Sequence, residues 1–356
     1  MRKKAYFKSV TIFLSILLVF SQLQLFSLPA YGETVSDQPL LFRSVGVAQN
    51  GTTYYVDGEG GNNANDGQSP ASAWRDFEKV NQTEFQPGDH LLLNAQSTWN
   101  NQLLHPKGNG TAAQKIVIDF YDTNDKGETI FETTRRPIIN GGGTYSTGTF
   151  KRAISGAVQL VNQEYWDISN LEVTNTPELD NLEGYKKPGD AQRAGILVLG
   201  YEQNRTFNSV TIRNNYVHDV QTEYYLNLSG NTATKRLKAV GGIIVLGSWF
   251  DENGNVVTAA NDHRTTTGFN DILIENNVIQ RVGLEGIRTK ADSDTSRGNT
   301  FYKTFSNITI RNNYLEDIAG DGIVLSEAKS GGVVEGNVAV RMCNADYGCL
   351  LYTSDA

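Results

Sequence analysis

The sequence has very little cysteine: two residues in 356, Cys343 and Cys349. The second belongs to the last eight residues, 349–356, which resemble a translated sequencing adapter and interrupt a repeat. We treat this stretch as an adapter scar, with an ordinary short tail as the alternative. Without it Cys343 has no partner, so a disulfide framework is excluded and the apolar core must hold the fold by itself.

Long apolar runs are also scarce. The one strongly apolar run, Val10–Phe20, is shorter than the roughly 20 residues that a membrane-spanning helix needs. It follows basic residues at positions 2–4 and precedes the small residues of Pro29–Gly32, which is the order of a secretory signal peptide; a membrane anchor is the alternative. We therefore expect a secreted protein with a signal peptide at 1–32 and a linker at 33–52.

Positive charge is in deficit. Removing residues 1–32 takes away four of the 31 cations and none of the 39 acids, so the net charge falls from −8 to −12. A charge of this sign argues against nucleic acid and anionic membranes as partners. The partner that we expect is an extracellular polysaccharide, bound by a monomer.

What the sequence does contain is a repeat. Four segments share two alternating apolar residues, a polar turn with asparagine, and a further apolar residue: Val210–Val217, Ile272–Ile279, Ile308–Leu315 and Gly332–Ala339. Alternation with period two, broken by a fixed turn, indicates strand–turn–strand rather than helix. A second series of short apolar strands lies between these copies and begins at Gly195, Gly242, Gly286 and Gly322.

Three short strands per repeat predict an all-β fold, a right-handed parallel β-helix. The turn asparagines would stack as a hydrogen-bonded ladder: Asn215, Asn277, Asn313 and Asn337. Their spacings of 62, 36 and 24 residues indicate a minimal coil of 24 residues with insertions, which gather on one face of a solenoid. A β-propeller, the alternative, needs regular repeats of about 40–45 residues. Because no carboxy-terminal cap follows the last repeat, we expect a C-terminally truncated solenoid.

The amino-terminal part carries a family resemblance. Its strand Tyr54–Gly58, turn Asn65–Pro70, short amphipathic helix Ala73–Val80 and turn Gln86–Asp89 resemble the N-terminal cap of secreted pectate-lyase-like β-helix proteins. The resemblance implies a cap and first coils over 53–155 and coils over 156–348. It is specific for the fold and weak for the reaction, because the same scaffold carries lyases, hydrolases, epimerases and adhesins.

The strand Glu285–Lys290 provides the first candidate site. Arg288 and Lys290 must face outward, because two unpaired cations in a dry core would cost many kcal/mol. A uronate lyase needs a base, a proton donor and a cation that neutralises the substrate carboxylate. The strand is similar to the glutamate-then-lysine strand of alginate and dermatan lyases. Gly283 stands where that pattern has a calcium-binding glutamate, so the cofactor stays unknown and no metal ligands are assigned. A solvated pair that bonds Glu285 or Glu327 is the alternative.

A second cluster is expected one coil earlier, where Tyr201 and Lys238 would meet as proton donor and base of a metal-free lyase. The alternative is a loop tyrosine beside an ordinary basic loop. The neighbouring residues that we assign to substrate binding are Lys235, Arg236, Trp249, Tyr224 and Tyr225.

Other polar groups are weaker candidates for a functional site. His218-Asp219 should lie on a plain polar face of a third strand. Asp317, Asp321 and Glu327 could supply the acid pair of a glycoside hydrolase. Against that, the Asn-Thr-Asp, Asp-Asp and Gly-His-Gly motifs of β-helix polygalacturonases are absent. We therefore predict a secreted polysaccharide lyase acting on alginate or pectin, with a glycoside hydrolase or a carbohydrate-binding adhesin module as alternatives.

Overall fold

A computed structural model describes the coils and their cap, in these ranges: 41–143, 153–176, 191–202, 205–220, 240–247, 267–291, 304–326 and 328–343. The chain divides into two compact units, 1–40 and 41–356, and only the second contains described residues. The predicted signal peptide and the stretch 349–356 lie outside them. Within the described ranges, no helix is long and apolar enough to cross a membrane.

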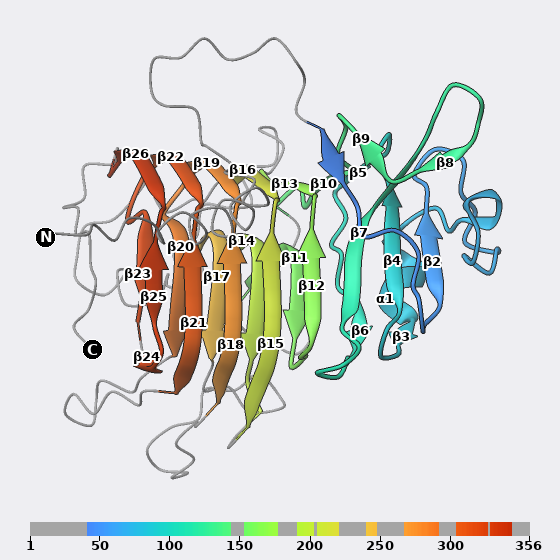
Figure 1. Cartoon of the computed structure of the whole chain (residues 1–356). Coiled ribbons are helices and arrows are strands. Elements are labelled where there is room, and N and C mark those ends of the chain that lie inside the picture. Colours follow the sequence, from blue (N-terminus) through green and yellow to red (C-terminus); the bar gives the residue numbers. More distant parts are fainter. Residues whose placement is uncertain are drawn as a thin grey trace, which may run out of the picture. The chain divides into compact units, whose positions relative to one another are not determined.

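Three large sheets form the coils of the described part of the second unit, and all of their strand pairs are parallel except β7–β8 (Figure 1). Two two-stranded sheets, β1–β9 and β3–β6, accompany them. The ten-stranded sheet contains β2 (Thr53–Val56), β4 (His90–Asn94), β7 (Ile116–Thr123), β8 (Thr129–Ile130), β12 (Trp166–Ser169), β15 (Thr206–Arg213), β18 (Gly268–Glu275), β21 (Phe305–Arg311), β24 (Ala328–Ser330) and β25 (Val333–Glu335). The seven-stranded sheet contains β5 (Thr98–Asn100), β10 (Ile138–Asn140), β13 (Glu172–Asn175), β16 (Tyr216–Val220), β19 (Val278–Val282), β22 (Tyr314–Ile318) and β26 (Val338–Met342). The five-stranded sheet contains β11 (Ala153–Val161), β14 (Ala191–Gly200), β17 (Gly241–Gly247), β20 (Glu285–Ala291) and β23 (Ile323–Leu325).

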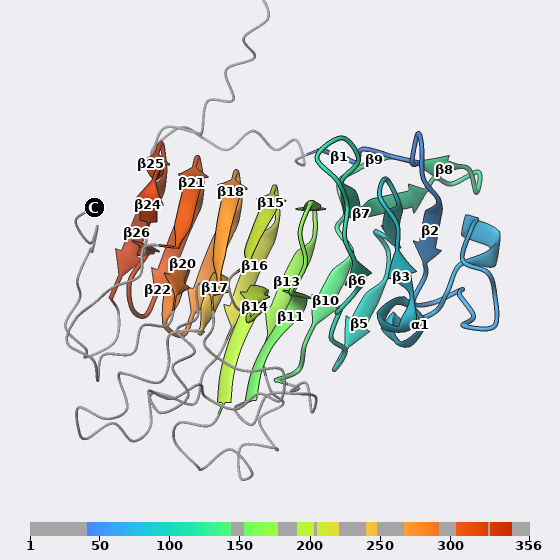
Figure 2. The ribbon, with the colours of Figure 1, turned by 90° about the horizontal axis from the view of Figure 1, so that it is seen from below.

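The chain visits the three sheets in turn, so that β15, β16 and β17 form one coil and β18, β19 and β20 form the next (Figure 2). The predicted right-handed parallel β-helix is therefore confirmed. Its first coils carry the remaining elements: β1 (Phe42–Arg43), a 3-10 helix (Pro70–Ser72), α1 (Phe77–Gln82), β3 (Glu84–Phe85), β6 (Lys107–Gly108) and β9 (Glu132–Thr133). The Asp76 side chain caps α1 by accepting from the Glu78 amide, while Phe77 and Val80 are buried.

The core is built from in-register columns of inward-facing side chains. One column runs through the ten-stranded sheet as Ile168, Ile212, Ile274 and Ile310, all of them fully buried. A stack of phenylalanines runs parallel to it: the ring centroids of Phe207 and Phe269, and of Phe269 and Phe305, lie 5.6 Å apart. Like residues at like positions therefore give each coil an apolar interface with the next.

The predicted asparagine ladder is present at the turn between the ten- and seven-stranded sheets. The Nδ2 of each member donates to the Oδ1 of the next: Asn215 to Asn277 over 3.1 Å, Asn277 to Asn313 over 3.0 Å, and Asn313 to Asn337 over 2.9 Å. Each Oδ1 also accepts from the backbone amide of the preceding asparagine. The ladder thus satisfies backbone and side-chain groups that are buried in the turn.

One expectation about stability is wrong. Cys343 is disulfide-bonded, whereas we expected an unpaired cysteine; its partner lies outside the described residues. The sequence argument failed because it discarded the tail that holds the second cysteine. The coils before Cys343 are nevertheless held together by core packing and strand pairing.

Candidate active site

The chain carries most of its extra length in the connections that lead to and from the strands of the five-stranded sheet. The coils are shortest between the other two sheets. Every internal range outside the described residues adjoins a strand of this sheet: 144–152, 177–190, 203–204, 221–239, 248–266, 292–303 and 327. Insertions on one face of a solenoid are typical of its binding face. The outer face of the five-stranded sheet is therefore the candidate binding face.

A glycine near the start of β20 decides which of its side chains reach this face. A Cβ on Gly286 would lie 2.5 Å from the core residue Leu315, so Gly286 points inward, and the next residue, Ile287, also belongs to the core. Two successive inward positions break the alternation. The residue before the glycine, Glu285, therefore shares the outer side with Arg288, three positions later.

The outer face is apolar along β14 and β17. Leu197, Ile244 and their neighbours form a second hydrophobic cluster, separate from the core, against which Tyr201 packs. The full cluster is Ala194, Leu197, Leu199, Ile244 and Leu246. Tyr201 thus lies beside the apolar part of this face.

The face becomes charged at β20. Arg288 lies in register with Ile244, and Lys290 with Leu246, as the outward assignment predicts. Arg288 forms an ion pair with Glu285. The exposed fraction is 5% for Glu285 and 6% for Lys290, so these charged groups are buried although they face away from the core. This burial strengthens their electrostatic interactions.

A second acidic residue, Asp321, lies next to Glu285 in the backbone register. The amides of Gly286 and Ile287 donate to the carbonyls of Asp321 and Gly322, both over 2.9 Å. This register places Asp321, two residues before β23, opposite Glu285, and neighbouring backbone segments in a parallel sheet lie about 4.8 Å apart. Glu285 and Asp321 therefore occupy neighbouring backbone positions in successive coils, with Glu285 buried and Asp321 partly buried.

Most of the second predicted cluster falls outside the described residues: Lys238, Lys235, Arg236, Trp249, Tyr224 and Tyr225. Its pairing of Tyr201 with Lys238 stays a prediction. Glu327, proposed as one acid of a hydrolase, also lies outside them. In the sequence, Glu285 was considered as the glutamate of the glutamate-then-lysine strand and as a partner of Arg288. Its outward position was not expected, because strict alternation would turn it inward.

His218 lies on the outer face of the seven-stranded sheet, in register with Gln280. Its ring nitrogens bond Asp219 over 2.6 Å and Glu172 over 3.2 Å. Burial alone would lower the pKa of His218, but these two hydrogen bonds raise it above its ordinary value. Arg281 also pairs with Asp219, over 2.7 Å. The groups neutralise one another, which fits the plain polar face that we expected.

Asp317 belongs to the same outer face. Its carboxylate accepts from Arg341 over 2.6 Å, and Glu316 pairs with the same guanidinium. A carboxylate held by arginine is a poor proton donor. Within the described ranges, no group of three or more histidine, cysteine, aspartate or glutamate residues could hold a metal ion.

Comparisons with known proteins bear on the reaction. No family model matches the sequence. The chain is 28% identical over 318 residues to a lacto-N-biosidase of Bifidobacterium longum subsp. longum; the match covers 78% of this chain and 19% of that protein. A crystal structure of the GH136 lacto-N-biosidase from Eubacterium ramulus has a TM-score of 0.55 at 23% identity and is matched over 78% of this chain and 45% of its own. The chain thus spans about a fifth of the curated relative and under half of the solved one.

These relatives are glycoside hydrolases. The prediction of a lyase is wrong. The sequence misled us because the cap and the Glu285–Lys290 strand belong to a scaffold shared by both reaction types. A structural likeness to a rhamnogalacturonan lyase is weaker, with a TM-score of 0.39 at 15% identity over 82% of this chain and 62% of that chain, and carries no argument. Because the reaction is not that of a lyase, the lyase roles predicted for Lys290, Arg288, Tyr201 and Lys238 no longer apply.

Proposed function

We propose that the protein is a secreted glycoside hydrolase that cleaves an extracellular glycan on the outer face of the five-stranded sheet. Its similarity over 318 residues to a lacto-N-biosidase is the observation that carries the proposal. The predicted signal peptide supports secretion. The face with the inserted segments supports the location of the site.

Glu285 and Asp321 are the carboxylates that we assign to the reaction. Glycoside hydrolysis uses two carboxyl groups, one that protonates the leaving oxygen and one that acts as nucleophile or base. The ion pair with Arg288 favours the ionised form of Glu285, which suits the nucleophile or base. Asp321, beside it and less buried, is then the proton donor.

The test is hydrolysis of p-nitrophenyl β-lacto-N-bioside by the full chain. We expect release of p-nitrophenol, and no absorbance rise near 235 nm when alginate or pectin is supplied instead. Glu285→Gln and Asp321→Asn should each lower kcat at least about 100-fold, the usual cost of losing a catalytic acid or base. Asp317→Asn is the matched control, because Asp317 and its partner Arg341 both belong to the seven-stranded sheet and not to the five-stranded one.

Binding of the glycoside without turnover would overturn the proposal in favour of a carbohydrate-binding module. Turnover that survives both E285Q and D321N would keep the hydrolase and refute the assigned carboxylates. A drop in kcat for D317N equal to that of D321N would also refute the assignment, since it would indicate a general loss of structure.

A further inference from the structure

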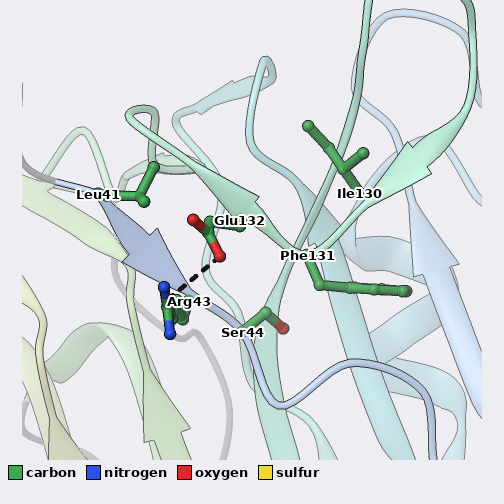
Figure 3. Close-up of a pocket in the computed structure, with 6 residues that line it drawn as sticks. All are labelled: Leu41, Arg43, Ser44, Ile130, Phe131 and Glu132. Carbon is green, nitrogen blue, oxygen red and sulfur yellow. Dashed lines mark ion pairs between the residues drawn. The ribbon is translucent and has the colours of Figure 1, made fainter.

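The segment Leu41–Val47, which we call the N-terminal strap, lies against the first coils. Phe42 and Arg43 form β1 and pair antiparallel with β9, and the Ser44 amide donates to the Phe131 carbonyl over 2.9 Å. Arg43 forms a 3.1 Å ion pair with Glu132, at the depression between the strap and the segment that carries β8 and β9 (Figure 3). The strap begins within the range 33–52 that the sequence assigned to a linker.

Burial of apolar side chains does not hold most of the strap in place. Leu41, Val45 and Val47 are 53%, 47% and 41% exposed, so their side chains gain little from docking. The strap is held instead by polar contacts of its backbone. Its contacts with the coils include three: the Val45 amide with Asp119, the Arg43 carbonyl with Asn170, and the Gly46 carbonyl with His90.

Asp119 is the acceptor for the strap. It sits at an outward position of β7, in the column that continues through Leu92 on β4, and yet it is fully buried. One carboxylate oxygen accepts from the Val45 amide over 2.9 Å, and the other from Asn170 over 2.9 Å. An outward carboxylate becomes buried here because the strap lies over it.

We propose that the strap is an acid-tightened latch, in which docking over Asp119 is linked to proton uptake by that carboxyl group. Docking takes the carboxylate out of water, and release returns it to water. The charged form is penalised only in the docked state. Acidification therefore favours the docked strap, and the latch loosens toward neutral pH.

The size of the effect follows from the two states of Asp119. Desolvation by burial, partly offset by hydrogen bonds, raises its pKa from 3.8 to about 6 in the docked state. A released carboxylate returns toward 3.8. Linkage then makes the docking equilibrium roughly 30-fold more favourable at about pH 4.5 than at about pH 7.5.

The other charged groups around Asp119 do not reverse this dependence. Arg213 on β15 favours the carboxylate, and its effect is already part of the pKa of Asp119. Asp119 in turn favours the charged form of Arg136, which lies before β10. Burial lowers the pKa of Arg136 to about 10, so Arg136, whose guanidinium lies 3.8 Å over the Phe42 ring, keeps its charge across this range. His90 donates to Gly46 through Nδ1–H, which it can do in either charge state.

The test is hydrogen exchange of the Ser44 and Val45 amides in the full chain between about pH 4.5 and 7.5, after correction for intrinsic exchange rates. Wild type should show roughly 30-fold greater protection at the acidic end, with β15 amides as an internal reference. Asp119→Asn, which keeps the shape and one acceptor, should abolish the pH dependence. Glu275→Gln alters a carboxylate of the same outer column that pairs with Arg311, away from the strap, and should leave the dependence unchanged.

Strap protection that is independent of pH in wild type, or greater at neutral pH, would overturn the latch. So would a dependence that persists in D119N. His90→Gln separates the remaining possibility: if this variant, and not D119N, removes the dependence, the histidine is the titrating group and the proposal fails. None of these outcomes depends on hydrolase activity.

Discussion

Replacing Asn277, inside the asparagine ladder, should destabilise the protein far more than replacing Asn337, the last asparagine of the ladder. Asn277 is buried, and its side chain serves three neighbours: the Asn215 amide donates to its Oδ1 over 3.0 Å, and its Nδ2 donates to the Ile212 carbonyl over 2.9 Å and to Asn313 over 3.0 Å. Asn277→Ala leaves these groups without that partner, in a turn closed to water.

The magnitude can be worked from that inventory. A buried polar group that loses its hydrogen bond costs about 1–3 kcal/mol, so two or three such groups should lower the free energy of unfolding by roughly 3–5 kcal/mol. Asn337 makes the same kinds of bond but is only partly buried. Water can replace it, so Asn337→Ala should cost about 1 kcal/mol.

The assay is urea unfolding of both variants, followed in parallel by circular dichroism and by tryptophan fluorescence to check that the transitions coincide. A cost for N277A below about 1.5 kcal/mol, or no greater than that of N337A, would refute the idea that buried ladder bonds hold the coils in register.

Two further predictions concern the corner glycine and the polar face. Gly286→Ala should cost more than about 2 kcal/mol in urea unfolding, because its Cβ would lie 2.5 Å from Leu315. Gly127→Ala, with a φ of +77° and nothing within 4 Å of the added Cβ, should show backbone strain alone, about 1 kcal/mol; equal costs would contradict the packing argument. The raised pKa of His218 adds stability below its unfolded value of about 6.5, and this stability is lost as the pH rises through the folded pKa. The urea midpoint should therefore fall from about pH 6 to pH 8 in wild type more than in His218→Gln. An equal dependence of the midpoint on pH in both proteins would contradict the idea that Glu172 and Asp219 stabilise the protonated form of His218.

The coils could be predicted from the sequence because their signals are local and repeated. Alternation, the turn asparagines and the insertion lengths each marked the same register, and the structure pairs Ile212 with Ile274 and Ile274 with Ile310 as that register requires. Because Arg288 and Lys290 are cations at alternate positions of one strand, the sequence was enough to predict that both side chains face outward.

The rest depended on contacts that carry no periodic signal. Two inward positions in succession, at Gly286 and Ile287, shift the alternation by one and bring Glu285 to the outer face. A prediction from strict alternation therefore places Glu285 on the wrong side of the sheet. The strap escaped notice for a related reason: it docks through backbone groups, so nothing in its side chains marks Val45 as the partner of Asp119. The reaction could not be read because a shared scaffold does not define chemistry.

The ladder keeps nearly the same bond length, 3.1, 3.0 and 2.9 Å, although its asparagines are 62, 36 and 24 residues apart in the chain. The stacking of coils is thus insulated from the amount of chain inserted between them. Evolution, or a protein engineer, can lengthen, shorten or exchange the segments beside the five-stranded sheet while the coils keep their register. The register of the coils and the length of the inserted segments are therefore set by separate parts of the sequence.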